Sequence, residues 1–256
     1  MKALIAFTKK ELLEQVRTGK LLFLGILFIL FGIMNPAIAK LTPWFLEIFA
    51  DSLAESGMII TDVTVSAMDS WVQFFKNVPV ALIAFVLLEG SCFTREYQSG
   101  TLILSLTKGL ARHKVVISKT LVLAFLWTVG YWLCFGITYG YNAYFWDNSV
   151  AQNLLCSVTA WWLFGLWTIS LVVLFSTLSA TNTGVLLGTG GAVLASYLVG
   201  MIPKYGKFMP TLLTDGNSLI YGVAELDAYT TAMVIAGVAG IVCLIAAVVF
   251  FNKKQL

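Results

Sequence analysis

The polar stretch EGSCFTREYQSGTLILSLTKGLARHKVVISK occupies residues 89–119, between one apolar run and the next. Five of the chain's sixteen Lys and Arg residues lie in it. The whole chain is 59% hydrophobic and 11% charged, whereas soluble domains carry about 25% charged residues. A water-soluble fold of this size could not bury so much apolar surface, so the composition indicates a protein whose solvent is the lipid bilayer. We therefore interpret residues 89–119 as a loop that meets the aqueous phase between two membrane spans.

Six apolar segments approach the length of about 20 residues that a helix needs to cross a bilayer. They are residues 21–39, 72–93, 116–139, 154–178, 184–202 and 231–251. No stretch shows the alternation that is typical of a membrane β-barrel. We expect an all-α membrane protein, with six transmembrane helices in one domain over residues 1–256.

Two ionisable residues, Lys76 and Glu89, fall within the second segment. Charges at membrane depth are often functional. Lys76 could touch a substrate, or it could only reach toward the outer interface. We expect Glu89 to pair with Arg95 or with a basic residue of the N-terminal helix rather than to relay protons.

Basic residues are distributed unevenly between the two sides of these spans. With a cytoplasmic N-terminus, Lys40, Lys204 and Lys207 lie outside and Lys76 lies within a span, which leaves twelve of the sixteen basic residues inside. The positive-inside rule favours this orientation. We expect a multi-pass protein of the cell membrane with both termini in the cytoplasm.

The segment before the first span, residues 1–18, has the periodicity of an amphipathic helix. One arc is apolar and the opposite arc is charged: Ile5, Leu12, Leu13 and Val16 against Lys10, Glu11, Glu14 and Arg17. This pattern favours an interfacial helix on the inner leaflet. The alternative is an ordinary membrane-facing start that contacts no partner.

Proline and polar residues mark further features of the backbone. Pro36 predicts a kink or an end of the first span. Residues 40–70 are expected to form short helices across the outer mouth. Residues 203–229 are too polar to span, and we expect a pair of short helices that dip into the outer leaflet.

The fifth segment carries a small residue at every fourth position: Gly184, Gly188, Ala192, Ser196 and Gly200. Small side chains on one face let another helix approach closely. The pattern predicts a packing face, either within one subunit or between two subunits of a dimer.

The sequence holds no pattern for catalysis, a metal or a bound nucleotide. His113 is its single histidine, so an HExxH zinc site is excluded, and no GxSxG motif occurs. Residues 200–208 imitate a P-loop but hold one residue too many and lack the final Ser or Thr. We therefore expect no catalytic residue, no metal and no cofactor on this chain, and no nucleic acid partner.

Within residues 94–115, helical spacing indicates a short cytoplasmic helix. Ser99 or Thr101 can cap its start, and Gly109 can end it. Its apolar stripe consists of Leu102, Ile103 and Leu106. The stripe could pack on the membrane surface, or it could form a rigid lever that a cytoplasmic partner grips.

This loop resembles the signature of type-2 ABC transporter permeases. The resemblance rests on Glu96-Tyr-Gln-Ser-Gly100-Thr101, followed by Leu104, Leu106, Arg112, Ile117 and Lys119. The order of six spans, the amphipathic start, the Asn35-Pro36 step and the segment before the last span also match that family. Lys108-Gly109 stands where family members often have proline.

The resemblance implies a bacterial exporter of two permease subunits and two ATPase subunits, with ATP and Mg²⁺ bound by the ATPase. The second permease would be an identical or a related chain. Its ATPase-coupling site would map to Glu96, Gly100, Thr101, Leu102, Ile103, Leu106 and Arg112 of this sequence. Aromatic-rich spans suit an amphipathic or hydrophobic cargo, such as a peptide or a drug, but they suit lipid contact equally.

The alternative function is an ATP-independent secondary transporter or channel. Many such proteins are built from repeated halves and place ionisable residues at the membrane midplane. The chain shows neither convincing repeats nor abundant charge in its apolar segments. The sequence therefore favours an ABC transporter permease over an ATP-independent transporter or channel.

Overall fold

The computed structural model describes residues 2–50, 64–107 and 109–254, in which all regular secondary structure is helical. The helices are α1 (Lys2–Arg17), α2 (Lys20–Ile48), α4 (Ala67–Glu89), α5 (Thr94–Ser99), α6 (Thr101–Thr107), α7 (Arg112–Phe145), η1 (Asn148–Val150), α8 (Leu154–Leu178), α9 (Asn182–Gly200), α10 (Pro203–Gly206), η2 (Pro210–Thr214), α11 (Gly216–Ile220) and α12 (Leu226–Lys253). Six helical stretches among the described residues are long and apolar enough to cross a membrane, and α4 and α5 together form one of them. The expectation of an all-helical chain with six candidate spans is confirmed.

The first span differs from the prediction at its far end. Neither Pro36 nor Pro43 ends α2, which continues to Ile48. The expectation of short helices over residues 40–70 is therefore wrong at both ends of that range. Residues 40–48 belong to α2, and residues 67–70 begin α4. Residues 51–63 lie outside the described residues. A continuous helix satisfies its own backbone at membrane depth, and a proline removes only one of those hydrogen bonds.

The segment before the last span folds into α10, η2 and α11. Its apolar side chains Leu213, Leu219 and Ile220 are fully buried. They lie where η2 and α11 pack against α8, so the protein's own helices cover them. The prediction of short helices is confirmed; these three residues face the helix bundle, whereas Phe208 and Tyr221 of the same segment are exposed.

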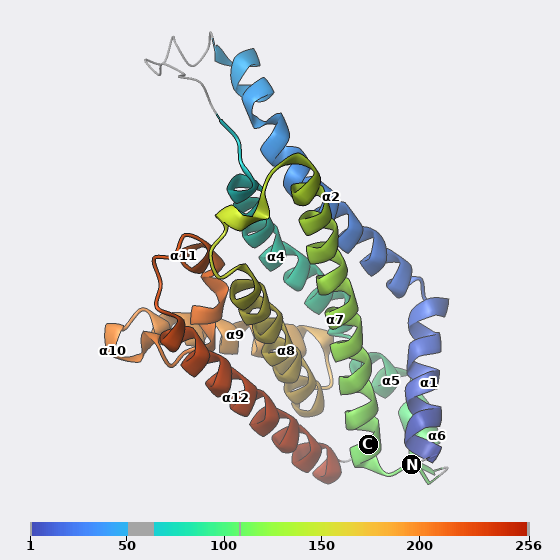
Figure 1. The fold of residues 1–256 in the computed structure, drawn as a ribbon. Coiled ribbons are helices and arrows are strands. Elements are labelled where there is room, and N and C mark those ends of the chain that lie inside the picture. The colour runs from blue at the N-terminus through green and yellow to red at the C-terminus, as the bar shows by residue number, and fades with distance from the viewer. Residues whose placement is uncertain (1, 51–63, 108, 255–256) are drawn as a thin grey trace.

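Figure 1 shows how the spans are arranged. α8 packs against α12, α9 and α7, and α2 packs against α4 and α7. The start of α1 and the end of α12 lie at the same end of the molecule, together with α5 and α6 (Figure 1). We call this the terminal end.

Aromatic side chains fill the space between α2, α4, α7 and α8. Trp127 is fully buried, with its ring 5.9 Å from Phe28 and 5.7 Å from Phe85 in edge-to-face contacts. Its indole N–H donates to the Trp162 carbonyl oxygen at 3.1 Å. Such pairs contribute beyond their buried area. Trp127, one of the aromatic residues of the spans, therefore belongs to the core, whereas Phe125 is exposed at the surface of the spans.

The face of small residues on α9 packs within the chain. A Cβ at Gly188 would lie 2.3 Å from the Phe175 ring of α8, and one at Gly200 would lie 3.0 Å from Thr211 Oγ1 of η2. A Cβ at Gly184 would meet Ser179 and Thr181 at the helix start; Ala192 packs against the core, and Ser196 Oγ lies 4.0 Å from Met209 Sδ. These small residues therefore let α9 approach α8 and η2 of the same chain closely.

Gly165 of α8 offers a test of the core packing. A Cβ there would lie 2.2–2.4 Å from three atoms of the Trp127 indole, which is itself buried and hydrogen-bonded. Gly165→Ala should therefore destabilise the protein by about 1–3 kcal/mol, measured as a lower Tm in detergent. Gly136→Ala on α7 is the control, because its Cβ would meet nothing within 4 Å. Equal Tm values for the two variants would contradict the packing.

Candidate functional site

A network of buried ion pairs joins α1, α5 and α7 at the terminal end. Lys119 of α7 is 2% exposed, and its ammonium nitrogen lies 2.7 Å from Glu11 Oε2 and 3.1 Å from Glu96 Oε2. The same nitrogen donates to the Cys92 carbonyl oxygen at 3.0 Å. Lys10 of α1 also forms ion pairs with both carboxylates. One buried cation and its partners thus hold α1 against α5 and α7, with Glu11 and Lys119 lying 108 residues apart in the sequence.

α1 turns one side of its charged arc toward the protein, while Lys10 and Arg17 of that arc are exposed. Glu11 and Gln15 are buried along it, whereas the apolar Ile5, Leu13 and Val16 are exposed. The amphipathic helix is confirmed, but its charged face contacts α5 and α7, where its counter-charges lie. The apolar face is the one that a bilayer can solvate.

Lys10 lies among three carboxylates. Glu11, Glu14 and Glu96 place oxygens within 4.8 Å of one another, a spacing that could hold a metal ion. The Lys10 ammonium lies 3.0 Å from Glu11 and 3.3 Å from Glu14, and it also contacts Glu96. Partial burial alone would lower the pKa of Lys10, but the hydrogen bonds and charges of Glu96 and Glu11 outweigh it and raise that pKa. Lys10 thus supplies the positive charge that a metal would bring.

Glu89 is a further buried carboxylate at this end. It is 1% exposed, and its Oε2 accepts a hydrogen bond from Gln15 Nε2 at 2.8 Å and lies 3.3 Å from Lys20 Nζ. Lys20 begins α2, directly after the N-terminal helix. The basic partner is therefore Lys20 of α2, not Arg95, which is exposed, and not a basic residue of the N-terminal helix. Lys76, the other ionisable residue of the second segment, is exposed on α4.

α5 and α6 form the short helical segment expected in the loop. Gly100 joins them with a φ of 69°, a left-handed conformation that favours glycine. Leu102 is 1% exposed inside the protein's own core, and Leu106 packs partly against that core. Ile103 is 44% exposed and Leu104 is 61% exposed. Of the predicted stripe, Ile103 is thus the side chain most open to a partner, and Leu104 lies next to it.

Thr101 and Arg112 complete the set of residues predicted from the sequence. Thr101 begins α6, with its hydroxyl 2.9 Å from Ser99 Oγ. Arg112 Nη1 donates to the Phe251 carbonyl oxygen at 3.0 Å and to the Lys254 carbonyl oxygen. A cation at a helix C-terminus complements its unpaired carbonyls. Arg112 therefore ties the start of α7 to the end of α12.

Lys254 makes the equivalent contact at the end of α8. Its Nζ donates to the carbonyl oxygens of Thr177 at 2.9 Å and Ser179 at 3.0 Å. Burial lowers the pKa of this lysine. Arg112 and Lys254 thereby connect the start of α7 with the ends of α8 and α12.

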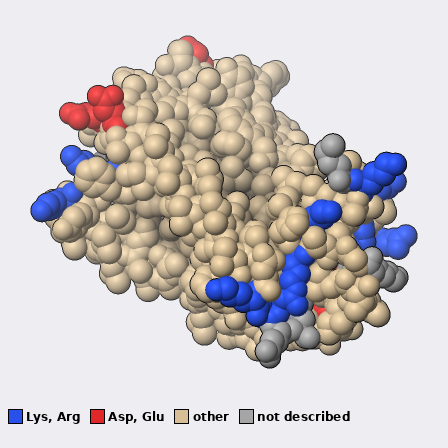
Figure 2. Space-filling model, turned by 90° about the horizontal axis from the view of Figure 1, so that it is seen from below, with Lys and Arg blue, Asp and Glu red and all other residues tan. Residues whose placement is uncertain are grey.

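Figure 2 looks directly at the terminal end. Lys and Arg side chains gather along one side of this face, where little acidic surface is visible. The carboxylates of Glu11, Glu89 and Glu96 are buried, so they contribute little to the surface. The exposed residues of α6 therefore lie at a predominantly basic end of the protein.

The pairing of Glu11 with Lys119 was not among the contacts expected from the sequence. Both residues carried a signal, because Glu11 lies on the charged arc of residues 1–18 and Lys119 lies where an apolar span begins. A charge in such a position needs a partner. The choice among the available partners required the three-dimensional packing.

The fold and this site define a multi-span membrane protein with a short helix pair at one end. The chain belongs to the ABC-2 family of transporter proteins, whose family model matches residues 5–256. It is the membrane, or permease, component of such a transporter. It is also similar to the uncharacterized transmembrane protein YxlG of Bacillus subtilis (strain 168), with 25% identity over 221 residues, which cover 82% of this chain and 81% of that protein. The resemblance noted in the loop is therefore confirmed.

Lys119→Met tests how much the ion-pair network contributes to the stability of the protein. The substitution keeps the bulk of the side chain but leaves Glu11 and Glu96 without their buried cation. Breaking a buried pair by removing one partner costs about 3–5 kcal/mol, so the Tm in detergent should fall strongly. Lys9→Met, at an exposed position of α1, should leave the Tm nearly unchanged. A Lys119→Met protein as stable as the Lys9→Met protein would show that the network contributes no stability.

Proposed function

We propose that the chain is the permease subunit of an ATP-driven exporter. Two copies of an ATPase subunit, which bind ATP and Mg²⁺, would act on two permease subunits, identical or related. The cargo is an amphipathic or hydrophobic molecule, peptide or drug-like in character. It leaves the cell or the inner leaflet through the spans.

The observation that carries this proposal is the two-sided character of α6. Leu102 anchors the helix in the core, while Ile103 and Leu104 present apolar side chains to the surroundings. Aliphatic side chains of this kind fit a groove on a partner protein. Behind α6, the network of Glu96, Lys119 and Glu11 links α5 to α7 and α1. A displacement of α6 would therefore be transmitted to the spans through these buried ion pairs.

The proposed orientation puts the terminal end in the cytoplasm, with the ATPase. Its support is the gathering of basic side chains at that end (Figure 2). The loop between α11 and α12, which includes the exposed Val223, would then lie outside.

Impermeant thiol labelling in intact cells tests this orientation. A cysteine at Val223 should react with the reagent, whereas a cysteine at Gln98, exposed on α5, should react only after the cells are permeabilised. The native cysteines are first replaced by Ala or Ser in both variants. Labelling of position 98 from outside would reverse the orientation.

Acidic substitutions on α6 test the coupling role. Ile103→Asp and Leu104→Asp should weaken binding of the ATPase at least tenfold, because an apolar anchor would be replaced by an unpaired charge. The measurements are co-purification of an ABC ATPase with this chain from the source cells and the rate of ATP hydrolysis by that ATPase. The Tm of the isolated permease should stay unchanged.

Leu102→Asp serves as the contrast, because it places a charge in the core. That variant should lose folded stability as well as ATPase binding. Normal ATPase binding by both the Ile103 and the Leu104 variants would contradict the coupling role of α6, whereas normal transport with no ATPase bound would favour the ATP-independent alternative.

A further inference from the structure

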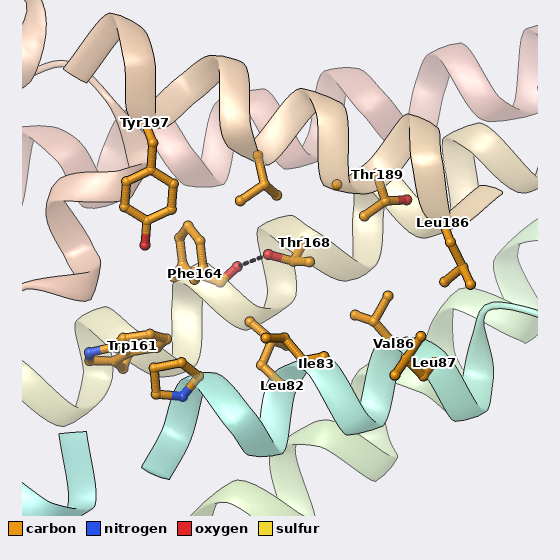
Figure 3. A pocket seen from close by; sticks show the side chains of 13 residues that line it. Leu82, Ile83, Val86, Leu87, Trp161, Phe164, Thr168, Leu186, Thr189 and Tyr197 are labelled. Atoms are coloured by element: carbon orange, nitrogen blue, oxygen red, sulfur yellow. Dashed lines mark hydrogen bonds between the residues drawn. The ribbon is translucent and has the colours of Figure 1, made fainter. Parts of the chain in front are cut away.

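Two hollows of the surface differ in their chemistry. The groove between α4, α8 and α9, which Figure 3 shows from close by, is lined mainly by apolar side chains such as Leu82, Val86 and Phe164. No charged side chain lines that groove, so it offers no charge by which a ligand could be selected. A second pocket, between the end of α7 and the start of α8, combines aromatic side chains with a carboxylate.

This second pocket lies at the end of the molecule opposite the terminal end (Figure 1). Its volume is about 730 Å³, within the range of about 300–1,000 Å³ that is typical of small-molecule sites. Phe135 and Tyr139 line it from α7, Leu154 and Leu155 line it from α8, and the connection between the two helices contributes Asp147. No basic side chain lines it. The pocket therefore offers an aromatic side, an aliphatic side and one acidic group.

The aromatic side of the pocket is held in place by the core behind it. The ring of the fully buried Trp71 lies 5.5 Å from the Phe135 ring and 6.4 Å from the Tyr139 ring. The side-chain amide of Asn148 accepts a hydrogen bond from the Trp71 indole N–H at 3.1 Å and donates one to the Tyr139 carbonyl oxygen at 3.2 Å. Because these contacts exist without a ligand, a ligand would not have to order this side of the pocket.

Asp147 supplies the charge of the pocket. Its carboxylate accepts hydrogen bonds from the Ser149 hydroxyl at 2.5 Å and from the Ser149 backbone N–H at 2.9 Å. These bonds lower the pKa of the Asp147 carboxyl, which is therefore ionised at neutral pH. The side chain is exposed and forms no ion pair among the described residues. Its full negative charge exceeds the partial positive charge, about half a unit, at the start of α8.

We infer that this pocket binds an organic cation with an apolar body, such as an alkyl- or arylammonium or a phosphonium compound. The positive charge lies beside the Asp147 carboxylate and the aromatic rings, whose faces attract cations, and the apolar body contacts Leu154 and Leu155. An anion would be repelled by Asp147, and a metal ion would find one carboxylate where it needs several oxygen ligands. The inference does not depend on the proposed ATPase, because the permease alone forms the pocket.

Binding of radiolabelled tetraphenylphosphonium to the purified full chain in dodecyl maltoside, measured by scintillation proximity, tests this site. The wild type should bind the label saturably. Asp147→Asn removes the charge but keeps an oxygen that can accept from the Ser149 N–H, so the affinity should fall about fivefold. Asp227→Asn is the matched control, because Asp227 is an exposed acid at the start of α12 that does not line the pocket. The control should leave the affinity unchanged.

Tyr139→Leu removes an aromatic face, so it should lower the affinity about threefold, and it decides the matter if Asp147→Asn does not fold. Benzyltrimethylammonium should displace the label, whereas the neutral triphenylphosphine oxide should not. No saturable binding, equal affinities of the wild type and the folded pocket variants, or displacement by the neutral compound would overturn the inference. Displacement by dihexanoylphosphatidylcholine but not by benzyltrimethylammonium would place a lipid headgroup in the pocket instead of a free cation.

Discussion

The rest of the terminal end depends on the buried ammonium group of Lys119. Removing this charge from water costs several kcal/mol, which only close opposite charges and hydrogen bonds can offset. Glu11, Glu96 and the Cys92 carbonyl oxygen supply those contacts. Because each comes from a different segment, satisfying one lysine fixes the positions of α1, the α4–α5 turn and α7 relative to one another. The charged side of α1 therefore faces inward.

The bilayer imposes a second constraint, since every backbone group at membrane depth must be satisfied within the chain. Long helices meet that requirement, and edge-to-face aromatic contacts around Trp127 fill the space between them. At the helix ends, where carbonyl groups lack intrahelical donors, Arg112 and Lys254 supply hydrogen bonds. These two residues connect the start of α7 and the ends of α8 and α12 at the terminal end.

Hydropathy predicted the six spans, and spacing predicted the helices at residues 1–18 and in the loop, because both patterns follow from local geometry. The continuation of α2 through Pro36 and Pro43 could not be predicted, since local rules favour a kink or an end at proline and only the surrounding bilayer favours continuation. At the candidate site, sequence identified Glu96, Leu102 and Ile103 but not which of them face inward. Burial of Glu96 depends on its contacts with Lys10 of α1 and Lys119 of α7, and Lys119 in turn pairs with Glu11, 108 residues away.

The central claim is that the ion-pair network makes α1, α5 and the start of α7 move as one unit in the proposed transport cycle, together with α6, which Gly100 joins to α5. Pulsed electron paramagnetic resonance on the assembled transporter tests it most directly, with spin labels at Leu13 of α1 and at Thr107 of α6, two exposed positions. The account predicts one narrow distance distribution that is unchanged by nucleotide in the wild type and that broadens in the Lys119→Met variant. A wild-type distance that shifts on ATP binding as much as the distance in that variant would contradict it.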